Sequence, residues 1–133
     1  MTDNSQKKII LVVEDNPLNM KLSGDLLELN GFEVLKASNG HSALEILKRN
    51  TPDLILMDIG LQDMDGFEVY RKIREDERFN SVMVVALTAL AMKEDEDKIK
   101  AAGFNFYITK PIDTKNFIKT IKEILSKVPS SFR

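Results

Sequence analysis

Five reactive side chains stand at the ends of apolar segments that have the composition of buried β-strands. They are Glu14 and Asp15 after the first segment, Asp58 after the third, Thr88 after the fourth and Lys110 after the fifth. In an open parallel sheet, the carboxyl ends of the strands lie at one edge, and ligands bind there. We therefore expect three carboxylates, one hydroxyl and one ammonium group to meet at this edge.

This set of groups is suited to phosphoryl transfer. Oxygen ligands without histidine or cysteine favour Mg²⁺, which also takes phosphate oxygens as ligands. A carboxylate such as that of Asp58 can act as a nucleophile and form an acyl phosphate. A metal ion, an ammonium and a hydroxyl can stabilise the charge on the phosphoryl oxygens. The three carboxylates would repel one another without cations, and Lys110 and a divalent ion supply that charge.

Each of these residues also has an ordinary structural interpretation. Acidic residues after strands often cap helices or lie in solvated loops, and a Thr at a strand end is more often structural than functional. Lys110-Pro111 taken alone reads as a surface turn, as does Ser38-Asn39-Gly40 after the second strand. The functional interpretation therefore depends on the joint occurrence of these residues after four strands of one sheet.

Strand-like and helical patterns alternate along the chain and position these residues. Strands are expected at residues 8–13, 33–37, 53–57, 82–87 and 104–109, and helices at about residues 41–49 and 92–102. One more helix has Phe67, Tyr70 and Ile73 as its buried stripe; the last has Phe117, Ile121, Ile124 and Val128 and stops near Pro129. Five strand–helix units with apolar strands predict a parallel sheet covered by helices on both faces.

The first helix is predicted from its cap and from a leucine repeat. Asn16 is expected as the N-cap, with Pro17 at the first helical position and Gly31 as the C-terminal stop. The leucines recur at the spacing of an amphipathic helix, at Leu18, Leu22, Leu26 and Leu29.

Composition restricts the class of protein. The 133 residues, of which 43% are hydrophobic, fit one domain over residues 1–133 with a core at about 8–127 and flexible ends. The absence of cysteine excludes disulfides and thiolate metal sites, and a net charge of −2 gives no general attraction to nucleic acids. The apolar runs are too short to cross a bilayer, and residues 1–8 are polar and lack the apolar stretch of a signal peptide. We expect a cytoplasmic monomer that binds neither nucleic acid nor membrane directly.

Several motifs carry a resemblance to a known family. Glu14-Asp15, Leu56-Met57-Asp58 with Asp65-Gly66, Leu87-Thr88-Ala89 and Thr109-Lys110-Pro111 resemble the receiver domains of two-component response regulators. The similarity covers about residues 8–127, and residues 14–22, 91–93 and 107–112 are most similar to single-domain members that regulate the cell cycle. It implies an α/β, flavodoxin-like (βα)5 fold of three layers, with a five-stranded parallel sheet in the order 2-1-3-4-5.

The resemblance also implies roles. Asp58 would accept a phosphoryl group from a histidine kinase or phosphotransfer protein, without turnover of a separate substrate. Mg²⁺ would be held by Glu14, Asp15, Asp58 and the Gly60 carbonyl. Lys110 would contact the phosphoryl oxygens, with a cis peptide bond to Pro111.

Signalling would follow from a conformational change. Thr88 would move towards the phosphate, Tyr107 would turn inward behind it, and the small Ala89 would leave space. This movement would reshape the surface of the fourth helix, fifth strand and fifth helix, which would bind a downstream protein such as a cell-cycle kinase. Gly60 and Leu90 flank the site and are expected to influence hydrolysis.

Two residues depart from the family pattern, and two other features have simple explanations. Gln62 stands where a Pro is common, and Phe106 where a small residue often precedes the switch aromatic. His41, the single histidine, is expected to be a solvated residue at a helix start. The acidic run of residues 94–97 is expected to be an exposed helix face or a partner-docking surface.

Other classes of protein fit less well. A phosphatase of the haloacid dehalogenase type also uses Asp, Mg²⁺, Thr or Ser, and Lys, but it needs a second acid at the position of Gly60. The glycine-rich motifs of nucleotide-binding modules are absent from the sequence. A receiver taken from a longer hybrid kinase or transcription factor is a third alternative, and Met1 and the short polar tail count against it.

Overall fold

The computed structural model describes residues 7–61, 64–89, 93–104 and 106–126, with the side chains of residues 93–95 excepted. Five parallel strands form one sheet in the order β2-β1-β3-β4-β5, as predicted. The strands are β1 (Ile9–Val13), β2 (Glu33–Ala37), β3 (Leu54–Asp58), β4 (Met83–Thr88) and β5 (Phe106–Thr109). The helices are α1 (Pro17–Leu29), α2 (Gly40–Leu47), α3 (Gly66–Arg74), η2 (Glu77–Phe79), α4 (Lys93–Ala102) and α5 (Phe117–Ser126).

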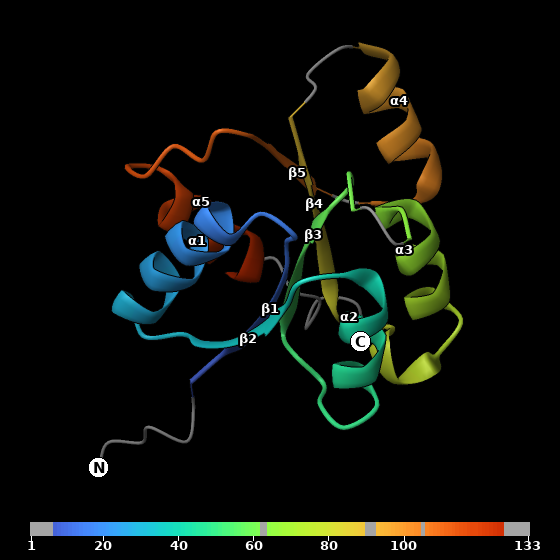
Figure 1. Ribbon diagram of the computed structural model, residues 1–133, viewed down its shortest axis with the longest axis horizontal. Helices are drawn as coiled ribbons and strands as arrows, with labels where there is room; N and C mark the ends of the chain where they lie inside the picture. The colour runs from blue at the N-terminus through green and yellow to red at the C-terminus, as the bar shows by residue number, and fades with distance from the viewer. Residues whose placement is uncertain (1–6, 62–63, 90–92, 105, 127–133) are drawn as a thin grey trace.

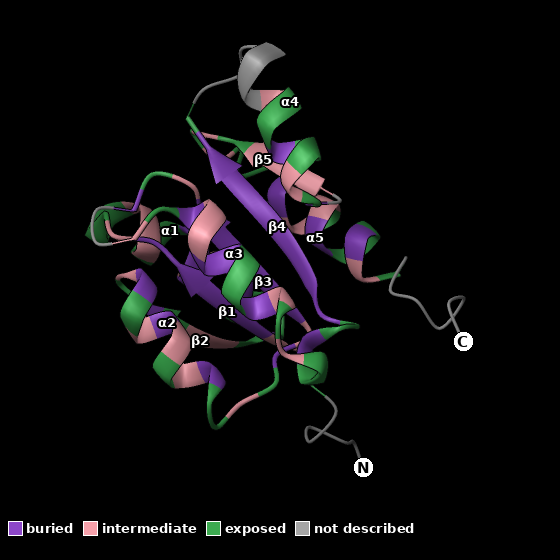
Figure 2. Cartoon of the chain, turned by 90° about the vertical axis from the view of Figure 1, so that its right-hand side faces the viewer, coloured by how far each residue is buried: buried purple, intermediate pink, exposed green. Residues whose placement is uncertain are grey.

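The sheet is the middle of three layers. Helices α1 and α5 cover one face, and α2, α3 and α4 cover the other (Figure 1). Alternate residues of each strand point to opposite faces, so Ile10 and Val12 pack with Leu27 and Ile121, whereas Leu11 and Val13 belong to the core under α2 and α3. The central strands β3 and β4 are buried along their whole length (Figure 2), as their apolar composition predicts.

Element limits differ from the predicted ones by one to two residues. Strand β1 begins at Ile9, α2 ends at Leu47, and β5 begins two residues after its predicted start. Asp58 and Thr88 are the last residues of their strands rather than the residues after them, so their backbones are held by the sheet. Residues 127–129, where the last helix was predicted to end, lie outside the described residues.

Helix α1 confirms its predicted cap and corrects the interpretation of its leucines. The Asn16 side chain accepts hydrogen bonds from two backbone amides of the first turn. The buried residues are Ser23, Gly24 and Leu27, whereas Leu18 and Leu29 are 79% and 82% exposed. Small residues on the inner face let the helix lie close to the sheet, with the Lys36 side chain passing over Gly24. Of the four leucines in the repeat, Leu26 packs on the core and the other three are exposed.

Among the described residues, no helix has both the length and the apolar character of a membrane-crossing segment.

Gly66 lets the start of α3 pass directly over the end of β3. Its amide donates to the Ile59 carbonyl at 3.1 Å. A Cβ at this position would lie 2.7 Å from the Asp58 carbonyl oxygen and 2.8 Å from the Ile59 Cα. Because both are backbone atoms, the backbone of Asp58 and Ile59 would have to move to make room for a side chain at position 66.

We predict that Gly66→Ala lowers the free energy of unfolding by about 1–3 kcal/mol, the usual cost of overpacking. Gly60→Ala is the matched control, since a Cβ there would meet its nearest neighbour at 3.7 Å, an ordinary contact. Urea denaturation followed by circular dichroism measures both variants. Equal stability of the two would contradict the close approach at Gly66.

Candidate functional site

The register of the sheet brings the ends of four strands to one level. Met57 is opposite Val13, Asp58 is opposite Leu87, and Thr88 is opposite Thr109. Backbone hydrogen bonds continue beyond the strands, from the Ile59 amide to the Leu87 carbonyl and from the Lys110 amide to the Thr88 carbonyl. The loops that carry the functional side chains therefore begin from fixed positions.

The three carboxylates form one cluster. Ligand oxygens of Glu14, Asp15 and Asp58 all lie within 4.8 Å of one another. Glu14 and Asp58 are buried, and Asp15 is half-buried. Oxygen donors of this kind are those that Mg²⁺ prefers, and the open side of the cluster has room for the waters that Mg²⁺ keeps. The donor set therefore fits a magnesium ion.

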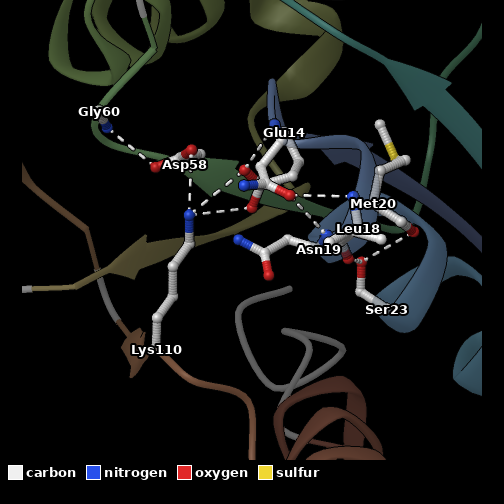
Figure 3. A network of polar contacts seen from close by, with 9 residues as sticks. Glu14, Leu18, Asn19, Met20, Ser23, Asp58, Gly60 and Lys110 are labelled. Atoms are coloured by element: carbon white, nitrogen blue, oxygen red, sulfur yellow. Dashed lines mark hydrogen bonds and ion pairs between the residues drawn. The ribbon is translucent and has the colours of Figure 1, made fainter.

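The Lys110 ammonium lies between two of these carboxylates (Figure 3). Its Nζ is 3.0 Å from Glu14 Oε1 and 3.1 Å from Asp58 Oδ2. The peptide bond that follows Lys110 is cis, as expected. Lys110 follows β5, an edge strand of the sheet, and its ammonium thus links the residue after β1 with the last residue of β3.

Burial and ion pairing act against each other in this cluster. Burial raises the pKa of Glu14, the Lys110 hydrogen bond partly offsets this effect, and the neighbouring Asp58 adds to it. Burial lowers the pKa of Lys110, but its bonds to both carboxylates outweigh burial and raise the pKa overall. Lys110 is thus held in its charged form, whereas the surroundings of Glu14 disfavour the charged form of its carboxyl group.

Asp58 is held through both of its oxygens. Oδ1 accepts a hydrogen bond from the Gly60 amide at 2.9 Å, and Oδ2 is paired with Lys110. A cavity of about 380 Å³ opens above it. The cavity is lined by Glu14, Asp15, Asn16, Asn19, Asp58, Ile59, Gly60, Thr88, Ala89 and Lys110. Every residue predicted for phosphoryl transfer and metal binding therefore lies in one cavity.

The predicted switch residues lie at and beside this cavity. Thr88 is buried, and both Thr88 and Ala89 contribute to the cavity wall. Tyr107 is half-buried, and its hydroxyl donates a hydrogen bond to the carboxylate of Glu96 in α4. This bond raises the pKa of Tyr107, with smaller contributions from burial and from the negative charge of Glu96. Tyr107 is therefore tied to α4 in this structure.

Sequence reasoning missed two features of the site. Asn19 lines the cavity, and its spacing of three residues from the cap Asn16 was the signal that could have placed it there. Glu96, which belongs to the run expected to be an exposed helix face or a partner-docking surface, is half-buried and bonded to Tyr107.

Other predicted features have simpler outcomes. Within the same acidic run, Asp97 is exposed as expected, and so is His41 in α2. Phe106 is half-buried and packs on the core under α1 and α5. Gln62 and Leu90 lie outside the described residues.

The chain is similar to known proteins over most of its length. The sequence profile of the response regulator receiver domain matches residues 10–122. The polar-differentiation response regulator DivK of Brucella anthropi is 46% identical over 118 residues, which are 89% of this chain and 96% of that protein. This likeness agrees with the expected similarity to single-domain cell-cycle regulators.

Solved structures show the same fold. The receiver domain of a sensor histidine kinase from Pseudomonas aeruginosa, with a magnesium ion in its active site cleft, is 34% identical. Its TM-score is 0.80, with 92% of this chain and 97% of that chain covered. A chemotaxis response regulator of Vibrio cholerae has a TM-score of 0.85 at 24% identity, with 90% and 99% covered. The second likeness supports the fold alone.

Replacing Glu14 by Gln tests the electrostatic balance of the cluster. Because burial raises the pKa of Glu14, a neutral amide of the same size should raise the free energy of unfolding of the Mg²⁺-free protein at pH 7. A raised pKa contributes stability that is present below the unfolded-state pKa and is lost as pH rises through the folded-state pKa. The wild type should therefore gain stability from this group as pH falls, and Glu14→Gln should lack that gain.

The same variant tests metal binding. Mg²⁺ at a hundredfold excess over its dissociation constant should stabilise the wild type by up to ~2.7 kcal/mol, and Glu14→Gln should lose most of this effect. Urea denaturation with and without Mg²⁺ measures it, with the exposed Glu28→Gln on α1 as the control. Equal stabilisation of both variants by Mg²⁺ would exclude Glu14 as a ligand.

Proposed function

Because the chain belongs to the response regulator receiver family, we propose that it is a phosphorylation switch that accepts a phosphoryl group on Asp58. The observation that carries the proposal is the position of this carboxylate. Asp58 ends the central strand β3, is 5% exposed, and faces the cavity between Lys110 and two further acids. It is the acid of the cluster that both the Gly60 amide and the Lys110 ammonium hold in place.

The transfer step follows from the nature of these groups. A carboxylate oxygen of Asp58 attacks the phosphorus of a phosphohistidine while the phosphorus–nitrogen bond breaks. The imidazole leaves with the bonding electron pair and takes up a proton from solvent. Lys110, already bonded to Asp58, is within reach of the phosphoryl oxygens and offsets their charge, and the Thr88 hydroxyl donates to one of them.

Glu14, Asp15, Asp58 and the Gly60 carbonyl would hold Mg²⁺. The ion, when bound, would neutralise charge on the carboxylates and on the phosphoryl oxygens. Before transfer, the protein keeps Glu14 and Asp58 together through the Lys110 bridge. The donor would be a histidine kinase or a phosphotransfer protein, as membership of the family implies. The protein itself turns over no separate substrate.

The signal would leave the site through Thr88 and Tyr107. A phosphoryl group adds roughly −1.5 to −2 charge and new acceptor oxygens that attract the Thr88 hydroxyl. Movement of Thr88 opens a space beside Ala89 for the Tyr107 ring, which would exchange its bond to Glu96 for an inward position. The surface of α4, β5 and α5 would then change shape and bind a downstream protein. By the likeness to DivK, that protein would be part of a cell-cycle pathway, such as a kinase.

We predict that Asp58→Ala abolishes phosphorylation by acetyl phosphate in the presence of Mg²⁺, because the nucleophile is removed. Mass spectrometry of the intact protein detects the added phosphoryl group. Asp25→Asn is the control, since Asp25 lies on the outer part of α1, where it pairs with Lys21. Labelling of the Asp58 variant at the wild-type level would refute Asp58 as the acceptor.

We also predict that Glu96→Gln lowers the pKa of Tyr107 towards its ordinary value, because it removes the carboxylate that stabilises the protonated phenol. In the wild type this bond is present while the phenol is protonated and is lost as pH rises through the raised pKa. Carbon NMR of labelled tyrosine measures the titration, with Tyr107→Phe for assignment. The signal of Tyr70, which donates to the Gly103 carbonyl, serves as an internal control and should not change.

The same substitution should favour the inward position of Tyr107 and strengthen binding of beryllofluoride severalfold. If the pKa of Tyr107 falls but beryllofluoride binding is unchanged, the bond to Glu96 has no part in switching.

A further inference from the structure

Asn19 is a polar residue that lines the cavity, and it has no part in the phosphoryl transfer proposed above. It lies in the first turn of α1 and is half-buried. Its backbone carbonyl accepts a hydrogen bond from the Ser23 hydroxyl, whereas its side-chain amide makes no hydrogen bond to any other described residue. In Figure 3 this amide extends from α1 towards Lys110. An amide placed in this way has two donors and one acceptor available for a ligand.

The neighbouring Asn16 has a structural role, because it is the N-cap of α1. Its carbonyl oxygen accepts hydrogen bonds from the amides of Leu18 and Asn19, at 2.9 and 3.1 Å, and thereby caps the helix. Asn19 has no such duty, because the cap is complete without its side chain. Helix formation therefore does not account for an asparagine at this position.

The in-line geometry of phosphoryl transfer suggests a role for the Asn19 amide. The group that attacks or leaves phosphorus lies in line with, and opposite to, the Asp58 oxygen. Asp58 ends β3, Asn19 lies in the first turn of α1, and both residues line the cavity. Among the other described residues of the lining, Ile59 and Ala89 have apolar side chains, Gly60 has none, and the side-chain oxygen of Asn16 already caps α1. Asn19 is therefore a polar side chain of the lining that has no bond to another described residue and can contact an in-line group.

We propose that Asn19 binds the water that hydrolyses the aspartyl phosphate and so sets the lifetime of the phosphorylated state. Its amide oxygen accepts a hydrogen bond from this water and directs the lone pair of the water at phosphorus. A bond forms between the water oxygen and phosphorus as the bond from phosphorus to the Asp58 oxygen breaks. Asp58 leaves as a carboxylate, and the proton of the water passes to a phosphoryl oxygen of the phosphate product.

This inference rests on the proposed phosphorylation of Asp58, and the experiment separates the two. The protein is labelled with acetyl phosphate and Mg²⁺, the donor is removed, and the loss of label is followed as a first-order decay. A wild type that takes up no label refutes the proposed function itself. A labelled wild type with the same decay as Asn19→Ala refutes only the role of Asn19.

We expect Asn19→Ala to slow the decay about 3- to 10-fold, the loss of one ordinary hydrogen bond in the transition state. Alanine has a higher helix propensity than asparagine, so the helix should remain folded. Asn30→Ala is the matched control. It removes an amide from the other end of the same helix, where the side chain donates to the Leu26 carbonyl, and it should decay as the wild type does.

Two further measurements separate this role from its alternatives. Affinities for Mg²⁺ and for beryllofluoride, which mimics the bound phosphoryl group without an attacking water, should be unchanged in Asn19→Ala. A weakened affinity for Mg²⁺ would place Asn19 on the waters of the metal, and a weakened affinity for beryllofluoride would place it on the phosphoryl group. Either result, or a decay that is faster than in the wild type, would overturn the proposal.

Discussion

The ion pair of Lys110 with Glu14 and Asp58 is the interaction on which the site depends. It joins residues that are 96 positions apart in the chain, and it does so where two of the participants are buried. Three carboxylates within 4.8 Å of one another would separate without a cation between them. Lys110 offsets only part of this charge, and the pKa of Glu14 is raised, first by burial and then by the neighbouring Asp58. Negative charge on the three carboxylates therefore remains uncompensated, and a divalent ion can neutralise it.

The rest of the fold keeps this unfavourable cluster from relaxing. Strands β3 and β4 are buried throughout, and the helices on both faces hold the sheet in place. Backbone hydrogen bonds from Ile59 to Leu87 and from Lys110 to Thr88 extend the order past the strand ends. The close approach of Gly66 to the backbone of Asp58 and Ile59 fixes the next loop as well. The apolar layers thus stabilise an arrangement of charges that would not form alone.

Sequence patterns predicted those parts of the molecule that depend on local composition or on chain order. Apolar β-rich runs predicted the strands, and Asn16-Pro17 predicted the start of α1. The acids, Thr88 and Lys110 could be placed together because parallel strands end at one edge. The leucine repeat of α1 predicted the helix but not its inner face, because spacing identifies a helix face without showing which face is inward. Here the small Ser23 and Gly24, together with Leu27, form the inner face.

The contacts that sequence patterns did not predict are those between side chains on different elements. The acidic run of α4 gave no sign that one of its members, Glu96, turns towards β5 and binds Tyr107. Likewise, an asparagine one turn after a helix cap is unremarkable until the helix is placed against the cavity. Both positions depend on how a helix is rotated about its own axis, and the spacing of its polar residues does not determine that rotation.

The half-buried side chains of Tyr107 and Asn19 also fit the function proposed for the site. The charged residues Glu14, Asp58 and Lys110 are bonded to one another and to the sheet, so the proposed acceptor, Asp58, is preorganised. Tyr107 and Asn19 lie at the border of this network, the first with one exchangeable bond to a helix and the second with an amide that no described residue binds. A switch needs a rigid acceptor and movable neighbours, because only groups with an alternative partner can respond to a new charge. The buried ion pair supplies the rigid part, and the half-buried Asn19 in the cavity and Tyr107 beside it supply the movable neighbours.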